Sequence, residues 1–600
     1  MEKSLPTPTS AALQHKLDFL IELVLILVLS ISPILFGSVD PFPILIIEIG
    51  VFLILLLWFL KCINQGFFEF VKLPLNKTSL LFLIFVLAQY LFIDFFISDF
   101  SLGAVYSQKI KTEILKLVSY ITLFYIILNN FQERKKINRL MYALICIGFF
   151  LSFLGIVQKL SGAEKIFWIS KVPYNSAAFS SFPNRNHFTS YIDMIIFLEL
   201  GMVFSKFPVL RGDMQDFRKK EIVKGIAATF QKGIWLYMTA LIVMVSGLFY
   251  SLSRGGIFSF VCGLLFFSVL ILLKNLTRRG YVFLLIILAL TSALLIWIDA
   301  PGQIIKRFNE IKVTKAPLAE RIMGERKIYA DKTVELIKGY PLLGVGFGAF
   351  SFIYNEKYSP KIKHGDSYYY LDHAHNDFLE LFCEVGLVGF IILFITACLY
   401  ILFMIKILPK RHDPYVIGIA TGALAGLFTM CIHSFFDFNL HITSNAVLFF
   451  VTSGLAIVVA TSHTAEKTEG MLLSKSAPFL IKSLYLKLLL SIIALTAFFY
   501  SAGIIIKPYR AYQISQRGNT NIADLKEAIR LDSMNDKYHF LLAKFFIEKA
   551  RRDLQHYQRY IALAVIEVKE AIRLNPWEKY YPVYLKWIFK VFSPSIRRLS

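Results

Sequence analysis

Long uninterrupted apolar runs constrain this chain more than any other feature of its sequence. Many of them approach or exceed the roughly 20 residues that an α-helix needs to cross the core of a bilayer. Of the 600 residues 56% are hydrophobic and 18% are charged, whereas a soluble protein carries roughly a quarter charged residues. The runs are continuous, which excludes the alternating strands of a β-barrel. We therefore predict an all-α fold, a polytopic membrane bundle of about 12–13 transmembrane helices.

The loops that connect the predicted spans differ from one another in charge. The spans lie at 17–36, 43–61, 78–98, 114–129, 138–158, 187–205, 234–252, 256–273, 280–298, 383–405, 415–436, 444–461 and 483–506. The loops at 132–139 and 274–279 are rich in Lys and Arg, whereas those at 37–42 and 437–443 contain neither. By the positive-inside rule, the N-terminus lies in the cytoplasm and the latter two loops lie outside.

This orientation gives the predicted organisation of the whole chain. Residues 1–16 form a cytoplasmic N-terminus, 17–298 form transmembrane helices 1–9, and 383–506 form helices 10–13. The long loop at 299–382 then lies on the extracytoplasmic side, because long loops cross the membrane regardless of their charge. The net charge of +23 falls mostly in short loops, so we interpret it as a determinant of topology and expect no nucleic-acid partner.

After the last span, the composition changes to that of a small helical domain at 507–600. The segment "LKEAIRLDSMNDKYHFLLAKFF" (525–546) is similar to "VKEAIRLNPWEKYYPVYLKWIF" (568–589), which starts 43 residues later. Both have the pattern of a tetratricopeptide-like helical hairpin, although 43 residues exceeds the usual period of about 34. We expect this domain on the outside if there are thirteen spans, and it is a candidate surface for a protein partner.

Four polar clusters fall where predicted spans meet the outer face. They are "SFPNRNHF" (181–188), "SLSRGG" (251–256), "HAHND" (373–377) and "HSFFDFNLH" (433–441). Ionisable residues at membrane depth cost roughly 2.5 kcal/mol or more, so they usually line a site or a pathway. The gathering of all four clusters on one face therefore predicts a site there.

Each cluster also has a purely structural interpretation. Arg254 is either a charge in a short turn or a cation for a phosphate, with adjacent glycines allowing close backbone approach. Arg185 and His187 are either interfacial residues next to a helix cap, at Asn184 or Asn186, or part of the site. Asp437 and His433 either pair with each other or satisfy backbone groups in a tight outside turn, and we favour these structural interpretations over a role in the site.

The stretch "HAHND" raises three interpretations. A metal site at His373 and His375 needs further ligands, and alternate residues share a side only in a strand, so we predict no metal. Asn376 or Asp377 is expected to be the N-cap of the following helix. A neutral imidazole is suited to general-base catalysis.

The extracytoplasmic loop contains an amphipathic helix followed by a Gly-rich turn, "PLLGVGFG" (341–348). We expect its glycines to allow a tight fold against the membrane domain. Arg326 begins the helix, where a cation gains nothing from the helix dipole, so we infer that it faces an anion. Arg321 is the nearby alternative for this role.

These motifs resemble those of the O-antigen ligase and polymerase superfamily. "HNDFLELFCEVGLVG" fits the pattern His-Asn, nine residues, Gly-x-x-Gly, and "SRGG", "PNRNHF" and "PLLGVGFG" are also similar to members of this group. The resemblance covers roughly residues 17–461. Phe390 departs from the pattern, because ligases tend to have Thr or Val there. This weakens the interpretation as a ligase relative to that as a polymerase.

The resemblance implies an inverting, metal-independent glycosyl transfer without a cofactor, at the periplasmic face of the bacterial inner membrane. The donor is an undecaprenyl-pyrophosphate-linked glycan, and the acceptor is lipid A-core for a ligase or a lipid-linked glycan for a polymerase. His375 would take the acceptor proton, while Arg254, Arg326 and Arg185 would hold the pyrophosphate. Asn376, His187, Arg321 and Asp437 would support them. The alternatives are a flippase, which needs polar residues through the whole membrane depth, and a non-catalytic scaffold.

Overall fold

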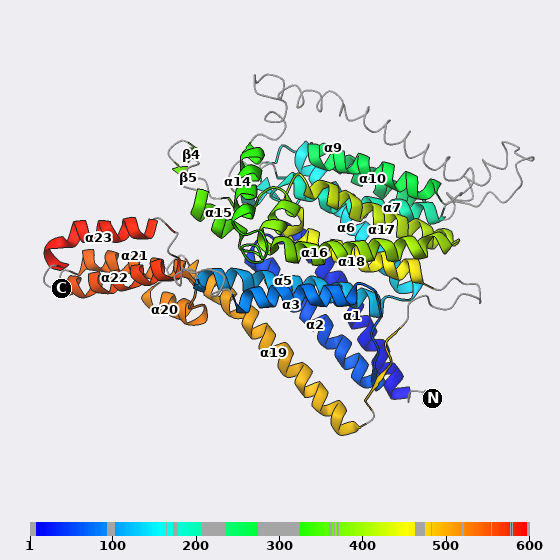
Figure 1. The fold of residues 1–600 in the computed structure, drawn as a ribbon, viewed down its shortest axis with the longest axis horizontal. Helices are drawn as coiled ribbons and strands as arrows, with labels where there is room; N and C mark the ends of the chain where they lie inside the picture. Colours follow the sequence, from blue (N-terminus) through cyan, green and yellow to red (C-terminus); the bar gives the residue numbers. More distant parts are fainter. Residues whose placement is uncertain are drawn as a thin grey trace, which may run out of the picture.

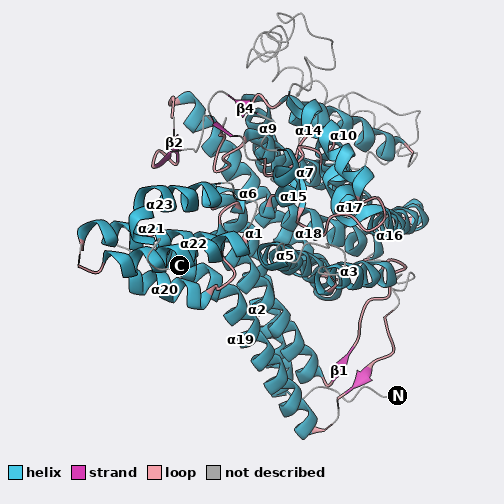
Figure 2. Ribbon diagram, turned by 60° about the vertical axis from the view of Figure 1, so that its left-hand side comes forward, coloured by secondary structure: helices cyan, strands magenta, loops and turns pink. Residues whose placement is uncertain are grey.

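The computed structural model of the chain describes most of its residues. The described ranges are 8–92, 103–163, 165–171, 178–206, 234–273, 325–358, 363–364, 367–368, 371–462, 475–481, 483–517, 521–553, 555–575, 578 and 580–596. Almost all regular structure within these ranges is helical (Figures 1 and 2), which confirms the predicted all-α class. The predicted span at 280–298 and the predicted site residue Arg321 lie outside the described residues.

The helices are α1 (Pro8–Ile34), α2 (Pro41–Gln65), α3 (Asn76–Leu91), α5 (Gly103–Asn130), α6 (Arg134–Leu160), α7 (Arg185–Lys206), α9 (Ile234–Tyr250), α10 (Arg254–Leu272), α14 (Glu325–Gly339), α15 (Phe350–Tyr358), α16 (Asp377–Ile407), α17 (Pro414–Ser434), α18 (Thr443–Thr461), α19 (Leu484–Ser515), α20 (Ile522–Leu531), α21 (Asp536–Arg552), α22 (Tyr557–Leu574) and α23 (Tyr580–Ile596). Three 3₁₀ helices are η1 (Phe36–Ser38), η4 (Leu408–Lys410) and η5 (Asn439–His441). The two-residue strands pair antiparallel: β1 (Phe67–Phe68) with β6 (Phe479–Leu480), β2 (Lys165–Ile166) with β3 (Ser170–Lys171), and β4 (Lys363–His364) with β5 (Ser367–Tyr368).

Nine helices in the described part of the chain are long and apolar enough to cross a bilayer. They are α1, α2, α6, α7, α10, α16, α17, α18 and α19, and each coincides with a predicted span. Two more predicted spans correspond to the shorter apolar helices α3 and α9, and the span at 114–129 lies within α5. The chain is therefore a multi-pass helical membrane protein.

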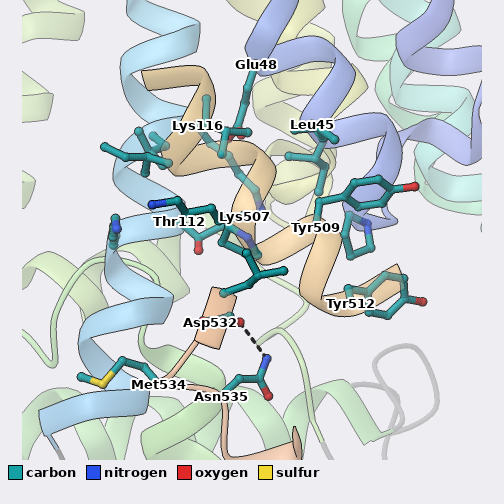
Figure 3. Close-up of a pocket in the computed structure, with 18 of the residues that line it drawn as sticks. Leu45, Glu48, Thr112, Lys116, Lys507, Tyr509, Tyr512, Asp532, Met534 and Asn535 are labelled. Carbon is teal, nitrogen blue, oxygen red and sulfur yellow. Dashed lines mark hydrogen bonds between the residues drawn. The ribbon is translucent and has the colours of Figure 1, made fainter. Parts of the chain in front are cut away.

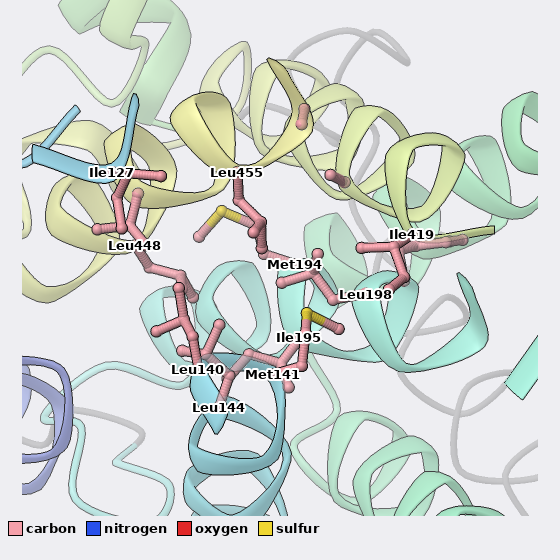
Figure 4. Packing of buried hydrophobic residues seen from close by; sticks show 14 of the residues in the cluster. Ile127, Leu140, Met141, Leu144, Met194, Ile195, Leu198, Ile419, Leu448 and Leu455 are labelled. Carbon is pink, nitrogen blue, oxygen red and sulfur yellow. The ribbon is translucent and has the colours of Figure 1, made fainter. Parts of the chain in front are cut away.

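Helix α7 forms the centre of the bundle, and every residue from His187 to Phe204 is buried. Figure 4 shows its apolar side chains between those of α6, α17 and α18. The labelled residues of this core are Ile127, Leu140, Met141, Leu144, Met194, Ile195, Leu198, Ile419, Leu448 and Leu455. Because α7 touches helices on several sides, the position of its N-terminal end is fixed by the whole bundle.

Glycines bring α7 and α17 into backbone contact. Gly418, Gly422 and Gly426 recur at every fourth position of α17, the spacing by which small residues let membrane helices approach closely. A Cβ added at Gly422 would lie 2.3 Å from the carbonyl oxygen of Phe197, and one at Gly201 would lie 2.1 Å from that of Gly418. Nothing larger than glycine fits at these contacts, so the end of α17 is held beside the start of α7.

Helix α16 is broken at Gly386, and the Gly-rich turn at 341–348 fills the break. Gly386 has φ +60° and ψ −168°, a conformation open essentially to glycine alone. The Gly346 N–H donates to the carbonyl of Glu384 at 2.9 Å, and a Cβ added at Gly344 would lie 2.5 Å from the Gly386 nitrogen. This confirms that the turn folds tightly against the membrane domain, and it fixes the start of α16.

The helical repeats in the C-terminal domain follow the long helix α19, which runs on to Ser515. The two similar sequence segments form α20 with α21 and α22 with α23, and buried side chains from all four helices share one core. In Figure 1, these helices and α15 lie at the left side of the bundle, far from the N-terminus at the lower right.

Candidate functional site

Asp437 lies at the centre of a polar cluster between the end of α17 and η5. Its side chain is fully buried. Its Oδ1 lies 3.0 Å from Nδ1 of His375 and accepts from the Phe438 N–H at 3.0 Å. Its Oδ2 accepts from Nδ2 of Asn186 at 2.6 Å and from Nη2 of Arg326 at 3.2 Å. We call Asn186, Arg326, His375 and Asp437 the Asp437 cluster.

This cluster joins residues from every polar stretch that the sequence singled out. Asn186 comes from "SFPNRNHF", His375 from "HAHND" and Asp437 from "HSFFDFNLH", while Arg326 is the second residue of α14. The fourth stretch is connected through Ser253, whose hydroxyl donates to Oδ1 of Asn186 at 2.7 Å. The four segments therefore converge on one buried carboxylate.

Of the two structural interpretations of Asp437 and His433, the structure shows the backbone contacts of a tight turn and no bond between the two side chains. The Asp437 side chain bonds other partners, and only its backbone N–H contacts the His433 carbonyl, at 3.1 Å. The His433 imidazole instead lies 2.5 Å from the Ser190 hydroxyl of α7, through Nδ1. The reason is the close α7–α17 packing, which presses the end of α17 against α7 and leaves Asp437 in the turn beyond it.

The surroundings of Asp437 keep it ionised. Burial by itself raises the pKa of this carboxyl, but the hydrogen bond with His375 and the positive charge of Arg326 outweigh burial and hold the pKa well below its usual range. An ionised carboxylate only accepts hydrogen bonds. His375 therefore carries its proton on Nδ1, and Nε2 is left with the lone pair that a general base needs.

The backbone of His375 is held in an unusual conformation. Its φ is +53°, in the left-handed region that costs non-glycine residues roughly 1–2 kcal/mol. The imidazole stacks on Tyr329 of α14, with ring centroids 6.1 Å apart, and meets the edge of Phe438 at 4.9 Å. Contacts on two sides and the bond to Asp437 hold the ring in one orientation despite this strain.

A second cluster also contacts the Phe438 ring, through His373, and its members are His373, Asp377, Glu380 and His441. Nδ1 of His373 lies 2.9 Å from Oε1 of Glu380, whose Oε2 accepts from the Ala374 N–H at 2.7 Å. Nδ1 of His441 lies 2.8 Å from Oδ1 of Asp377, and its Nε2 lies 3.3 Å from Oε1 of Glu380. We call these four residues the Glu380 cluster.

His373, Glu380 and His441 are the one group within the described residues whose ligand atoms lie close enough together to hold a metal ion. Burial by itself lowers the pKa of His441, but the charge of Glu380 and the bond to Asp377 outweigh it and raise the pKa to about 10. At neutral pH both ring nitrogens of His441 then carry protons and offer no lone pair. We therefore describe the group as an ionic brace between η5 and the start of α16, and the absence of a metal stays a prediction.

Three expectations for "HAHND" can now be judged. The imidazoles of His373 and His375 bond different carboxylates, so the two do not form one ligand pair. Asn376 is the N-cap of α16, because its side chain accepts from the Leu379 N–H at 3.0 Å. Asp377 does more than begin the helix, since its carboxylate also accepts from the Leu440 N–H at 3.0 Å.

The glycines of "SRGG" approach protein groups. A Cβ added at Gly255 would lie 2.7 Å from Nε2 of His433, and one at Gly256 would lie 2.3 Å from Oγ1 of Thr189. They therefore serve the packing of α10 on α7 and α17, where we had expected an approach to phosphate. Ser253 caps α10 by accepting from the Gly256 N–H.

The predicted arginines differ in their surroundings. Arg254 is exposed at the first residue of α10 and makes no ion pair with any residue that the structure describes. Arg326 is 40% exposed on its side chain and also donates to the Phe436 carbonyl at 2.6 Å. Arg185 begins α7 next to Asn184, whose Oδ1 accepts from the Asn186 N–H at 2.9 Å.

His187 is buried, which excludes the interfacial position considered for it. Its side chain is 4% exposed, and Nε2 has no hydrogen-bond partner among the described residues. The ring meets Phe438 edge-on, with centroids 4.7 Å apart. Phe438 thus contacts the imidazoles of His187, His373 and His375.

Sequence reasoning missed several members of these clusters. Glu380 and His441 were not singled out, and Asn186 was considered only as a helix cap. The repeat of glycines in α17 was a usable indication, because it predicts close packing on a partner helix. Glu380 stands one helical turn after Asn376, but nothing in the sequence shows that His441, some sixty residues later, lies opposite it.

A cavity of about 430 Å³ opens beside the two clusters. His187, His373, His441 and Phe438 lie along its wall, as do Asn184 and Asp372. His375 is not among the residues that line the cavity, but its imidazole contacts the ring of Phe438, which is. A substrate against Phe438 therefore lies close to the imidazole of His375.

The geometry agrees with what comparison with known proteins finds. Residues 239–394, about a quarter of the chain, match the model of a family described as O-antigen ligase. A comparison with curated proteins finds no match. The matched region contains Arg254, Arg326 and His375, whereas Asn186 and Asp437 lie outside it. Residues 239–394 are thus similar to the O-antigen ligase family, which supports the resemblance of this chain to the O-antigen ligase and polymerase superfamily.

Proposed function

We propose that this protein transfers a glycan from undecaprenyl-pyrophosphate to an acceptor hydroxyl at the periplasmic face of the bacterial inner membrane, as an O-antigen ligase that acts on lipid A-core. The observation that carries the proposal is the 3.0 Å contact between Nδ1 of His375 and the buried, ionised Asp437. It leaves the opposite nitrogen of the ring free to act as a base. A histidine oriented by a carboxylate is a recurrent arrangement for this task.

The transfer is a single displacement at the anomeric carbon. Nε2 of His375 takes the proton of the acceptor hydroxyl while the acceptor oxygen forms the new C–O bond. The bond between the anomeric carbon and the pyrophosphate oxygen breaks, and its electron pair leaves with the pyrophosphate. Because attack and departure occur on opposite faces, the configuration at the anomeric carbon is inverted. Asp437 stabilises the imidazolium that forms.

Arginines provide the positive charge that the leaving pyrophosphate needs. Arg254 is exposed beside the Asp437 cluster, to which Ser253 connects it. A guanidinium is always protonated and binds phosphate oxygens in pairs. Arg326 uses two of its five N–H donors on Asp437 and Phe436, so it can support both the base and the leaving group. Arg185, at the start of α7, and Arg321 complete the proposed set.

With this charge in place, we propose that the reaction needs no divalent ion. The test is a transfer assay after thorough chelation, in which we expect the rate of the purified protein to stay unchanged. Loss of transfer that Zn²⁺ or Mg²⁺ restores would contradict this part of the proposal. Such a result would indicate that His373, Glu380 and His441 bind the metal ion.

A polymerase that extends a lipid-linked glycan is the second candidate. Phe390 favours it, since ligases tend to have Thr or Val at this position of the motif, and here its ring packs on Phe382 with centroids 5.0 Å apart. The experiment that separates the two offers lipid A-core and a carrier-linked repeat as competing acceptors to the purified protein in liposomes. A ligase labels lipid A-core, and a polymerase lengthens the carrier-linked glycan.

A further inference from the structure

A second, larger cavity lies where the membrane domain meets the C-terminal helices. Its volume is about 680 Å³, within the range of about 300–1,000 Å³ that is usual for ligand sites. Figure 3 shows side chains from α2, α5, α19 and the turn between α20 and α21 around it. The labelled residues are Leu45, Glu48, Thr112, Lys116, Lys507, Tyr509, Tyr512, Asp532, Met534 and Asn535.

The two cavities are neighbours along one path. Val39, Ile44, Glu113 and Lys116 line both of them. Together the two cavities extend from Phe438 and His373, past α2 and α5, to the turn that contains Asp532. We call these two adjoining cavities the long groove. It begins one ring away from His375 and ends against the C-terminal domain.

The groove contains polar groups that other parts of the protein do not satisfy. Glu48 is only 5% exposed, and its Oε1 has no hydrogen-bond partner among the described residues. Lys111 and Lys507 are exposed and make no ion pair with any residue that the structure describes. Lys116, in contrast, is already paired with Glu113 at 2.9 Å. The groove thus offers one buried carboxyl group and two lysines to a ligand.

Tyrosines give the groove flat apolar surfaces at its far end. Tyr509 stacks on Phe42 with ring centroids 5.4 Å apart, which fixes its plane. Tyr512 is 41% exposed, so its ring is open to a ligand. A sugar presents hydroxyl groups at its edge and C–H groups on its faces, so it can bond to carboxyl groups and stack on such rings. A lipid tail would gain nothing from Asp532 or Asn535 at the C-terminal wall.

We propose that the long groove binds the glycan of the acceptor, an oligosaccharide that carries at least one acidic group. This inference rests on the proposed transferase function. The terminal sugar of the acceptor lies at Phe438 with its hydroxyl toward His375. The more distant sugars lie between α19 and the α20–α21 turn, where Lys507 and Lys111 neutralise the acidic group. The C-terminal domain is then one wall of the acceptor site.

The test compares two groove variants, Lys507→Gln and Tyr512→Ala, with two controls on the same helix, Arg510→Gln and Tyr500→Ala. The control residues do not line the groove. The purified full chain in liposomes receives an acceptor with its whole oligosaccharide or one cut back to its terminal sugars. Loss of a hydrogen bond to a charged group predicts that Lys507→Gln raises KM for the whole acceptor about tenfold. The kcat of Lys507→Gln and its KM for the cut-back acceptor should change little. Both constants should also change little in the two control variants.

A binding measurement separates this inference from the proposed function. Titration calorimetry uses the lipid-free acceptor oligosaccharide, in its acidic form and in a form whose carboxyl groups have been reduced to alcohols. We expect the acidic form to bind more tightly, and Lys507→Gln to abolish that difference. If the wild type transfers nothing but this binding pattern holds, the proposed function fails and the groove stands. Equal KM values in all variants, or no binding by the wild type, would contradict the proposal that the groove binds the acceptor glycan.

Discussion

The Asp437 cluster and the Glu380 cluster both join histidines to buried carboxylates next to one phenylalanine, yet they are suited to different tasks. In the first, one carboxylate faces one imidazole, and Arg326 balances its charge. In the second, Asp377 and Glu380 enclose His441 and raise its pKa to about 10. Two carboxylates around a histidine keep it protonated, whereas one carboxylate shared with an arginine leaves a usable base. Charge balance therefore distinguishes His375 from His441.

The largest effect should come from Asp437→Asn, because it removes the group that sets the orientation and tautomer of His375. We expect transfer to fall about 10²–10⁴-fold with the helical fold retained. Transfer assays in liposomes, with circular dichroism of the same preparation, measure this. The matched variant Glu380→Gln should lower the thermal midpoint but keep most of the activity of each folded molecule. Equal losses of activity in both variants would contradict the proposal that only the Asp437 cluster acts in catalysis.

Gly386→Ala should affect both clusters together, since the break in α16 fixes the helix start that supplies members to each. A Cβ there would lie 2.4 Å from the Gly344 nitrogen and from the Leu342 oxygen. The cost is expected to be about 3 kcal/mol or more, from the backbone conformation and the clash. Thermal unfolding in detergent measures it. Gly503→Ala is the control, because no atom lies within 4 Å of its added Cβ. Similar midpoints for the two variants would contradict the role given to the break.

Arg254→Lys tests whether the exposed arginine beside the Asp437 cluster binds pyrophosphate in pairs of hydrogen bonds. Lysine keeps the charge but loses the forked geometry. We expect a decrease in transfer of about 10- to 100-fold, below the 10²–10³-fold loss that removal of a donor causes. The measurement is kcat/KM with the lipid-pyrophosphate donor. Arg134→Lys, at the ion pair with Asp413 on the opposite end of the bundle, should leave kcat/KM unchanged. If Arg254→Lys also leaves kcat/KM unchanged, Arg254 does not bind the leaving pyrophosphate.

The smallest expected effect is a change in stability with pH, which arises from the Glu380 cluster. The pKa of His441 is raised from 6.5 to about 10, so its stabilising charge is fully present below pH 6.5 and is lost as the pH rises toward 10. Asp377, Glu380, Glu384 and His373 are the titratable groups that face it. We expect the thermal midpoint of the wild type to fall over this interval, and that of His441→Gln to change less. Parallel curves would show that His441 is not held protonated.

Much of the fold could be predicted because the apolar runs are long and the loops differ in charge. Arg254, Arg326 and His375 could be proposed for the site because they stand in recognisable motifs, and the structure brings Arg326 and His375 together on Asp437. Their partners could not be predicted in this way. Whether Asp437 faces His433 or His375 depends on how closely α17 packs on α7, and this depends on glycine contacts across segments over two hundred residues apart. The brace at His441 depends on the break in α16, which no local pattern around His441 reveals.

The most direct test of the central claim is the transfer rate of His375→Asn. Asparagine tolerates a positive φ better than most residues, so this variant removes the base without adding backbone strain. We expect a loss of about 10²–10⁴-fold in transfer from the lipid-pyrophosphate donor, with an unchanged thermal midpoint. A folded His375→Asn protein that transfers glycan at the wild-type rate would contradict the assignment of His375 as the catalytic base.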